Sequence, residues 1–267
     1  MKLSEKQLEN IALGMIDWIR QNMNKIGAKK AVIGISGGKD STVTAALSAK
    51  AIGCENVYGL ILPAKEQEDL SDAIEICNSL KINYNIINIG DMVENLKSSI
   101  IGTGISVSRQ TEINIPPRIR MTALYAYAQS LSDALVVNTS NLSEDWIGYA
   151  TVYGDTAGAF SPMATLTSDE VIQVGRYLGV ADRFLEKPPA DGLTGKTDEE
   201  VFGFSYDILN KYLRTGNIDD QEIKDKIDSM HRSSRFKFIP IPIYNSGLKI
   251  CPDDIAEVYK FEDDDKR

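Results

Sequence analysis

The chain has 267 residues, of which 43% are hydrophobic and 25% are charged, so it has enough apolar material for a sizeable core. Its formal net charge is −9 and no Lys/Arg-rich run offsets it, which argues against nucleic acid as the main partner but allows one basic nucleotide pocket. The N-terminus lacks a signal-peptide pattern and no apolar run reaches about 18 residues, so we expect a cytoplasmic protein without membrane contact.

The predicted elements alternate between helices and strands over the first half of the chain. Ser4-x-x-Gln7 has the spacing of a capping box, and a helical apolar pattern continues to about Met23. Residues 102–114 are rich in Gly, Ser and Thr and are predicted to form a loop, with prolines at the start of the helix that follows. Short apolar runs predict strands at 31–35, 57–62, 85–89 and 134–137, and helical spacing predicts helices at 40–51, 66–80, 93–100 and 115–131.

Beyond residue 140 the predicted elements are mainly helices. Thr167-x-x-Glu170 caps a helix that runs to about Leu178. Prolines and glycines predict a mobile loop at 186–198, and Pro240-Ile241-Pro242 excludes a central strand in the tail. Two further helices are predicted at 205–213 and 219–232.

This order of elements predicts a Rossmann-like α/β fold: a doubly wound parallel sheet with a helical C-terminal extension. We expect a single domain over residues 1–267, with the α/β core at 1–185 and the loop and helical extension at 186–267. Ligands of such sheets bind beyond the carboxyl ends of the strands. Residues 36–41 and 138–145 both follow predicted strands, so we expect them to meet at that edge.

Ser36-Gly37-Gly38-Lys39-Asp40-Ser41 joins a predicted strand to a predicted helix. Such a turn gathers free backbone N–H groups at the positive end of a helix dipole, and its glycines let a phosphate approach closely. The serines add hydroxyl donors and Lys39 adds a charge. Asp40 fits beside phosphate when Mg²⁺ bridges the two. The alternative is a tight glycine turn whose Asp and Ser only cap the helix.

The loop is not a Walker A motif, because residue 33 is Ile and Asp40 follows the lysine. Its S-G-G-x-D-S string resembles the PP-loop of the N-type ATP pyrophosphatases, which have the adenine nucleotide alpha-hydrolase type of fold. Members cleave ATP between the α and β phosphates, adenylate a substrate and let a nucleophile displace AMP. The resemblance implies that ATP contacts Gly34, Ile35, Ser36, Gly37, Gly38, Lys39, Asp40 and Ser41, with Gln67 and Thr139 completing the site and Lys39 also catalytic.

Further blocks resemble the NAD synthetases. They are N-T-S-N-L-S-E at 138–144, G-Y-A-T-V-Y-G-D at 148–155, R-x-R-M at 118–121, and G-F-S-Y-D at 203–207 followed by Tyr212-Leu213. These blocks keep the family's order from about residue 8 to 243. The resemblance implies a ligase that amidates deamido-NAD (nicotinic acid adenine dinucleotide) with ammonia, giving NAD, AMP and pyrophosphate.

The same resemblance implies roles for single residues. Asp40 and Glu144 would hold Mg²⁺, Arg118 and Tyr153 would bind the dinucleotide, and Asp155 would take a proton from ammonium. Each also has a simpler interpretation: Glu144 and Asp155 as solvated loop acids, and Arg118 as a helix-start residue paired with a surface acid. Gln67 has the alternative of a solvated helix face.

The chain departs from the family pattern at several positions. Val152 and Ser168 stand where the ammonia-dependent members carry Lys, Ala159 where they carry Asp, and Pro189 where a Ser or Thr contacts ATP. The Y-A-T-x-Y-G-D wording is closer to the synthetase half of the glutamine-dependent enzymes, whose glutaminase domain has no room in this chain. Free ammonia or a separate ammonia-supplying protein is therefore expected, and a related carboxylate stays open as the substrate.

Two other functions use the same loop. Sulfur transfer to tRNA predicts a basic face and reactive cysteines, but the charge is −9 and Cys54, Cys77 and Cys251 form no C-x-x-C pair. A non-catalytic ATP sensor would bind ATP without needing Asp40, Glu144 and Asp155 together. The members of the resembling family are homodimers with sites near the interface, which implies a homodimer here.

Overall fold

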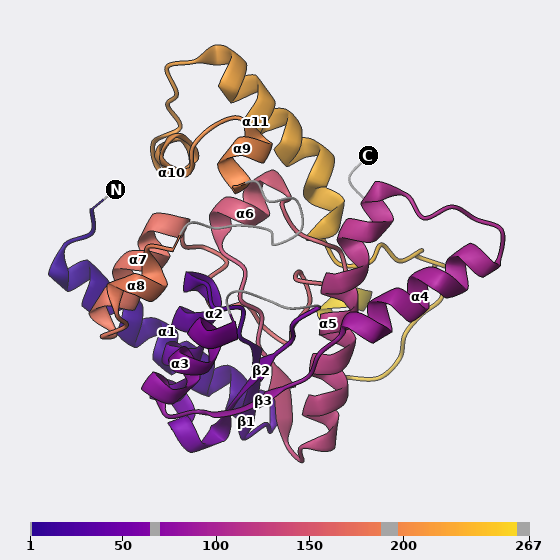
Figure 1. Ribbon diagram of the computed structural model, residues 1–267, viewed down its shortest axis with the longest axis horizontal. Coiled ribbons are helices and arrows are strands. Elements are labelled where there is room, and N and C mark those ends of the chain that lie inside the picture. The colour runs from indigo at the N-terminus through magenta and orange to yellow at the C-terminus, as the bar shows by residue number, and fades with distance from the viewer. Residues whose placement is uncertain (1, 65–69, 188–196, 261–267) are drawn as a thin grey trace.

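The computed structural model describes residues 2–64, 70–187 and 197–260, and a parallel sheet lies at its centre (Figure 1). Within these residues the sheet has four strands in the order β3-β2-β1-β4. In the register, Val32 of β1 lies opposite Tyr58 of β2 and Val136 of β4. The strands are β1 (Lys30–Gly34), β2 (Val57–Ile61), β3 (Asn83–Ile86) and β4 (Ala134–Val136). The predicted parallel α/β sheet is confirmed.

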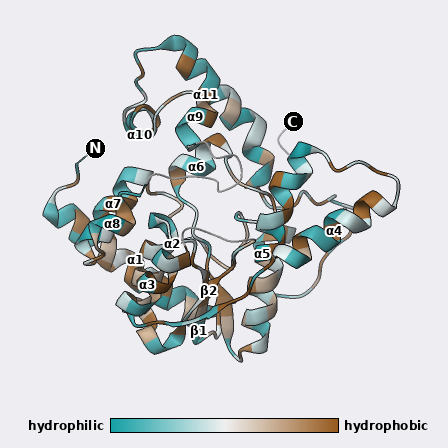
Figure 2. Ribbon diagram, in the orientation of Figure 1, coloured by the Kyte–Doolittle hydropathy of each residue, from teal (hydrophilic) through white to brown (hydrophobic). Residues whose placement is uncertain are grey.

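Helices cover both faces of this sheet, as predicted for a doubly wound fold. Ala31 and Ile33 of β1 pack into one apolar cluster with α1 (Glu5–Ile26), α2 (Lys39–Ile52), α3 (Leu70–Leu80) and α7 (Ser168–Tyr177). Val32, on the opposite face of β1, packs into a second cluster with α4 (Gly90–Gly102) and α5 (Arg109–Ser130). Figure 2 shows this apolar interior in the strands and more polar residues on the outer helix surfaces. Burial of strand side chains on both faces is typical of parallel sheets.

A third apolar cluster lies apart from the sheet and draws most of its helices from the C-terminal part of the chain. It is centred on Phe202, Leu209 and Ile227. Its helices are α6 (Leu142–Ile147), α9 (Asp198–Phe202), α10 (Tyr206–Thr215) and α11 (Gln221–Ser234), which lie together at the top of Figure 1. The remaining short elements are η1 (Cys54–Asn56), α8 (Asp182–Leu185), η2 (Arg235–Lys237) and η3 (Glu257–Tyr259).

The start of α5 corrects the prediction of a loop over all of 102–114. The hydroxyl of Ser108 accepts a hydrogen bond from the backbone N–H of Thr111 at 3.1 Å, which caps a helix that begins at Arg109. Pro116 and Pro117 therefore lie inside the helix and not at its start. Each proline removes one backbone donor, but its fixed φ is compatible with a helix. α5 continues past both prolines to Ser130.

Other local predictions are closer to the structure. The capping box at the start of α1 is confirmed, since Gln7 N–H donates to the Ser4 hydroxyl at 3.3 Å and Ser4 N–H donates to Gln7 Oε1 at 3.0 Å. β3 begins two residues before the predicted 85–89. Residues 240–252 form no helix or strand, which agrees with the exclusion of a central strand by Pro240 and Pro242. Every helix in the described ranges is too short or too polar to cross a bilayer.

Candidate active site

The loop between β1 and α2 has the geometry of an anion-binding turn. Gly37 has φ +89°, in the left-handed region that favours glycine, and Gly38 is the N-cap of α2. The amide of Gly38 donates to Ser36 Oγ at 3.2 Å, and the Ser41 hydroxyl donates to the Gly38 carbonyl at 3.1 Å. No side chain caps this end of α2. Its first-turn amides therefore point to the carboxyl edge of the sheet, where an anion can accept from them.

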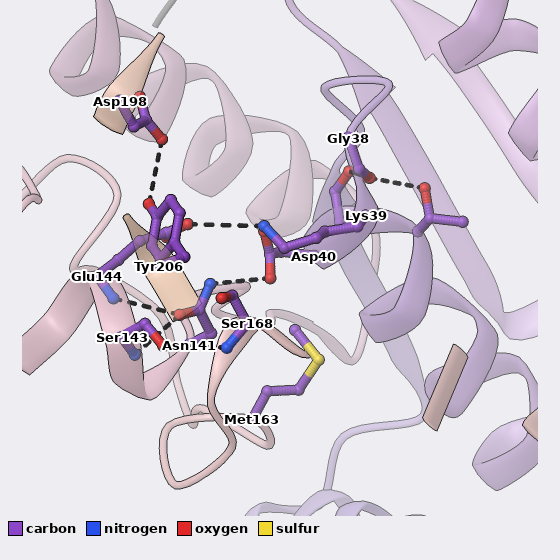
Figure 3. A network of polar contacts seen from close by, with 12 residues as sticks. Gly38, Lys39, Asp40, Asn141, Ser143, Glu144, Met163, Ser168, Asp198 and Tyr206 are labelled. Carbon is purple, nitrogen blue, oxygen red and sulfur yellow. Dashed lines mark hydrogen bonds and ion pairs between the residues drawn. The ribbon is translucent and has the colours of Figure 1, made fainter. Parts of the chain in front are cut away.

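Asp40 turns away from its own helix toward α6 (Figure 3). Asn141 Nδ2 donates to Asp40 Oδ1 at 2.9 Å, while Asn141 Oδ1 accepts the backbone N–H of Ser143 at 3.0 Å and of Glu144 at 3.2 Å. One buried amide thus caps α6 and orients the Asp40 carboxylate. This contact contradicts the simpler interpretation of Asp40 as a capping residue of α2.

The ammonium group of Lys39 lies between two carboxylates. Its Nζ is 2.9 Å from Asp40 Oδ2 and 4.0 Å from Glu144 Oε1, and only 7% of the side chain is exposed. Burial lowers the pKa of Lys39, but Asp40 and Glu144 outweigh burial and hold the pKa above its usual range. Burial and the charge of Asp40 raise the pKa of Glu144 to about 8, against the opposing effect of Lys39. The predicted meeting of segments 36–41 and 138–145 is confirmed by these contacts.

Two residues from the third cluster complete this arrangement, and neither was predicted as a site residue. Tyr206 places its ring 5.9 Å from Lys39 Nζ, and its hydroxyl donates to Asp198 Oδ2 at 3.1 Å. Both side chains are buried. The sequence signal for Asp198 is the capping box of Thr197 and Glu200, which places an acid at the first position of α9.

Asp155 lies on a separate turn that follows the end of α6. Its Oδ2 accepts the backbone N–H of Thr151 at 2.9 Å, and its carbonyl accepts from Asn138 Nδ2 at 2.7 Å. Asp155 is exposed, and loss of hydration beside the surrounding protein raises the pKa of its carboxyl group. Lys237 anchors the same region, because its Nζ donates to the carbonyls of Gly148 at 2.8 Å and Ala150 at 2.9 Å. Lys237 was not predicted as a site residue.

The structure brings Arg118 and Tyr153 to the Asp155 turn. Arg118 is exposed and its Nε donates to the Val152 carbonyl at 3.1 Å, so it contacts backbone in place of the surface acid of the simpler interpretation. Tyr153 is 65% exposed and has φ +60°. Thr139 lies half-buried just beyond β4, at the sheet edge that carries the glycine loop. Gln67 lies outside the described residues.

Comparison with known proteins decides the family. The model of the NAD synthase family matches residues 12–239. The chain belongs to the NAD synthase family. The NH(3)-dependent NAD(+) synthetase of Archaeoglobus fulgidus is 39% identical over 240 residues, which cover 87% of this chain and 94% of that protein. The Thermococcus kodakarensis protein of the same description is 42% identical over 197 residues, covering 73% of this chain and 76% of that protein.

Solved structures of this family superpose over most of the chain. NMN synthetase from Francisella tularensis gives a TM-score of 0.83 at 30% identity, covering 91% of this chain and all of that one. NH3-dependent NAD synthetase from Campylobacter jejuni, solved with a nitrate ion, gives a TM-score of 0.72 at 29% identity, covering 89% and 99%. The resemblance drawn from the sequence blocks, and the fold that it implied, are confirmed.

In this member of the NAD synthase family, a closed network of hydrogen bonds holds Ser143, the residue directly before Glu144. The Ser143 hydroxyl donates to Asn210 Oδ1 at 2.6 Å, Asn210 Nδ2 donates to the Ser168 hydroxyl at 3.0 Å, and Ser168 N–H donates to Ser143 Oγ at 3.0 Å. All three residues are buried. Ser168 therefore joins α7 to α6 and α10, at the position where a Lys was expected.

The donor set at Asp40 and Glu144 fits a hard divalent cation that also contacts phosphate. Their carboxylate oxygens are the ligands that Mg²⁺ prefers, and the ammonium of Lys39 between them shows that the place accepts positive charge. Among the described residues, no three His, Cys, Asp or Glu side chains are grouped to hold a metal. The remaining oxygen ligands would have to come from nucleotide and water.

His231 is part of the packing between α11 and α6. Its ring stacks on Trp146 with centroids 3.8 Å apart and planes 24° apart, and its Nδ1 lies 2.9 Å from the Trp146 carbonyl oxygen. Trp146 follows Glu144 by two residues in α6. This stacking joins the helix that carries Glu144 to the C-terminal extension.

Proposed function

We propose that this protein is an AMP-forming carbon–nitrogen ligase that amidates deamido-NAD with ammonia and ATP to give NAD, AMP and pyrophosphate. The observation that carries the proposal is the convergence of Asp40 and Glu144 on a PP-loop in a chain of the NAD synthase family. The relatives described as NH(3)-dependent NAD(+) synthetases support the choice of substrate and nitrogen donor.

ATP would bind along the carboxyl edge of the sheet. The first-turn amides of α2 and the hydroxyls of Ser36 and Ser41 are suited to the phosphates, with Thr139 at the adjoining strand end. The carboxylate of the nicotinate ring would attack the α-phosphate, so that a carboxyl–AMP bond forms as the bond to pyrophosphate breaks. The proposed contacts of the loop are Gly34, Ile35, Ser36, Gly37, Gly38, Lys39, Asp40 and Ser41.

Asp40 and Glu144 would hold Mg²⁺ in this site. When bound, the ion neutralises phosphate charge and favours departure of pyrophosphate. Asn141 would keep the Asp40 carboxylate directed at the nucleotide, because its other amide atom is already fixed by the amides of α6. The site thus has a rigid support for one of its two charged ligands.

Asp155 would act in the second half of the reaction. Ammonium must lose a proton before its nitrogen can attack, and a carboxylate with a raised pKa is suited to accept that proton. The nitrogen would then bond to the adenylated carbonyl carbon, and AMP would leave. Arg118, which donates to the Val152 carbonyl, and Tyr153 of the same turn would bind the dinucleotide.

We further propose a homodimer in the cytoplasm, supplied with free ammonia or by a separate ammonia-supplying protein. Four apolar side chains of α4 and the segment after it, Met92, Leu96, Ile101 and Ile105, are between 40% and 64% exposed. A surface group of this kind is typical of a protein interface. Cys54 and Cys77 are free thiols, as expected in a reducing compartment.

The test is direct. Purified protein is incubated with ATP, Mg²⁺, ammonium chloride and deamido-NAD, and NAD and AMP are measured by chromatography. We expect equal amounts of both, and less product when glutamine replaces ammonium. Nicotinate mononucleotide is run in parallel, because one solved relative is described as NMN synthetase. Preferential amidation of the mononucleotide would contradict deamido-NAD as the substrate.

A further inference from the structure

Lys39 is placed as if it were a bound cation. Its ammonium lies 2.9 Å from one carboxylate and 4.0 Å from the other, and the ring of Tyr206 closes a third side at 5.9 Å (Figure 3). The acidic Asp198, held by Tyr206, adds negative charge nearby. Two carboxylates that lie beside the same ammonium group and are only partly exposed repel one another unless a positive charge separates them.

The ammonium group of Lys39 already lies between the carboxylates of Asp40 and Glu144. Magnesium binds oxygen at about 2.0–2.1 Å and requires both carboxylates to turn toward it. An ammonium group already within hydrogen-bond distance of Asp40 competes for the same oxygens. Lys39 must therefore leave before the ion can contact both side chains.

We propose that Lys39 is a positioning residue that occupies the Asp40–Glu144 pair in the nucleotide-free protein and leaves when the metal arrives with ATP. The inference rests on the proposed function, because that function makes the two carboxylates the metal ligands. Lys39 is the first residue of α2, directly after the glycine loop, and its stem has four flexible carbons. Once displaced, its ammonium has the phosphates bound by the loop as the nearest new partner.

This arrangement couples metal binding to nucleotide binding. Without nucleotide, the metal has to displace the ammonium group of Lys39, which then has no new partner for its charge. Metal alone therefore binds weakly. With ATP, the phosphates compensate both the metal and the released lysine. Neutralising Lys39 therefore strengthens metal binding in the absence of nucleotide, although it removes a residue that contacts the site.

The experiment measures Mn²⁺ binding without nucleotide, from the electron paramagnetic resonance signal of the free ion. The variants are K39Q, K39R and the matched control K224Q. Lys224 of α11 also lies beside a carboxylate and an aromatic ring, but it is more exposed than Lys39; its Nζ is 2.7 Å from Asp228 Oδ2 and 5.5 Å from the Tyr212 ring. We expect K39Q to bind Mn²⁺ at least about tenfold more tightly than the wild type, because a competing charge about 3–4 Å from the ligands is removed. K39R and K224Q should stay close to the wild type.

Equal Mn²⁺ affinities of the wild type and K39Q would overturn the role of Lys39, as would tight binding by K39R. Thermal unfolding shows whether each variant is folded. Mn²⁺ should raise the unfolding midpoint of K39Q and leave that of the wild type unchanged. A K39Q midpoint that does not change with Mn²⁺ would also overturn the role of Lys39. Amidation by the wild type is measured in parallel. NAD formation with equal Mn²⁺ affinities rejects only the Lys39 role, whereas tighter binding to K39Q without NAD formation rejects only the proposed substrate.

Discussion

At the scale of single residues, the carboxyl group and the backbone of Asp155 are held by hydrogen bonds around its own turn. The Thr151 amide fixes one carboxylate oxygen and Asn138 fixes the backbone. We expect D155N to lower the turnover of the amidation about 10²–10³-fold, because the amide cannot accept a proton from ammonium. Turnover is measured as NAD formed at saturating ATP and ammonium. D207N, an exposed acid at the start of α10, is the control.

The same variant separates the two halves of the proposed site. Asp155 does not contact the Lys39 carboxylate pair, so D155N should bind Mn²⁺ as the wild type does. Unchanged turnover in D155N would contradict the base role, and altered Mn²⁺ binding would show that the turn and the loop are one unit.

Sequence reasoning predicted Lys39, Asp40 and Glu144 as site residues and missed Asp198 and Tyr206 for a physical reason. Asp40 and Glu144 follow two strands of one parallel sheet, so their approach is a consequence of topology. Asp198 and Tyr206 approach Lys39 only because the third cluster packs over the sheet edge, and that packing depends on contacts between segments far apart in the chain. Tyr206 belonged to a resembling block without an assigned role, and Asp198 had none. The catalytic, nucleotide and substrate roles themselves stay predictions.

At the scale of elements, α6 and α11 approach one another closely at a glycine. Gly148 ends α6 with φ +71°, and a Cβ there would lie 2.0 Å from Ser234 Cβ of α11. We expect G148A to reduce the free energy of unfolding by about 3 kcal/mol, from left-handed strain plus a clash that separates the helices. Urea denaturation measures this loss.

Gly216 provides the matched control. It ends α10 with φ +69° and has nothing within 4 Å of a built Cβ, so G216A carries the strain without the clash. Its expected cost is about 1 kcal/mol. Equal losses in the two variants would show that contact with Ser234 does not hold the helices together.

An ion pair joins α7 to α10 and gives stability a pH dependence. Arg214 Nε donates to Glu170 Oε1 at 2.7 Å, and Glu170 Oε2 also caps α7 at the Thr167 amide at 2.9 Å. Burial opposes ionisation of Glu170, but the bonds from Arg214 and Thr167 outweigh it and lower the pKa below its usual 4.5. A lowered carboxyl pKa adds stability above the unfolded-state pKa and loses it as pH falls through the folded-state value.

We therefore expect E170Q to be less stable than the wild type by about 2 kcal/mol at pH 7, since hydrogen bonds to a charged group are lost. The difference should shrink as pH falls below about 4.5, because the Glu170 carboxylate of the unfolded chain takes up its proton there and that of the folded protein does so at a lower pH. Chemical denaturation over this pH range checks it. A difference that does not depend on pH would assign the loss to packing.

The predictions of helices and strands succeeded where the local sequence pattern is typical of one kind of element only. Apolar runs gave the strands and the capping box gave the start of α1. The start of α5 was missed because residues 102–114 have a loop-like composition, and the decisive contact is one serine hydroxyl at Ser108. Pro116 and Pro117 strengthened that error, because a proline is common at a helix start but also tolerated inside one at the loss of a bond.

At the scale of the whole molecule, the exposed apolar side chains of α4 and the following segment lead to the proposed dimer. Ile101 is 58% exposed and Ile105 is 64% exposed, and both line a surface hollow of about 510 Å³. We expect the wild type to sediment as a dimer and the I101E/I105E variant as a monomer, because charged residues resist burial in an interface. A wild type that sediments as a monomer would contradict the proposal.

The predicted single domain, with a core at 1–185 and an extension at 186–267, stays a prediction. The packing of the described residues comprises two apolar clusters, one on each face of the sheet, and a third cluster that lies apart from the sheet. α6 belongs to the third cluster although it precedes residue 185, so contacts between the core and the extension include the Glu144 helix itself. Partial unfolding of the extension would therefore disturb the charged pair.

The stacking of Trp146 on His231 gives the protein an intrinsic optical reporter. The chain has only two tryptophans, and Trp18, which contacts Phe160 edge-on at 5.6 Å, lies on α1 outside the third cluster. Replacing Trp18 with Phe leaves Trp146 as the single tryptophan, two residues from Glu144. Its emission would follow the separation of α11 from α6 in real time, so that opening of the extension can be timed against the binding of nucleotide without attaching a dye.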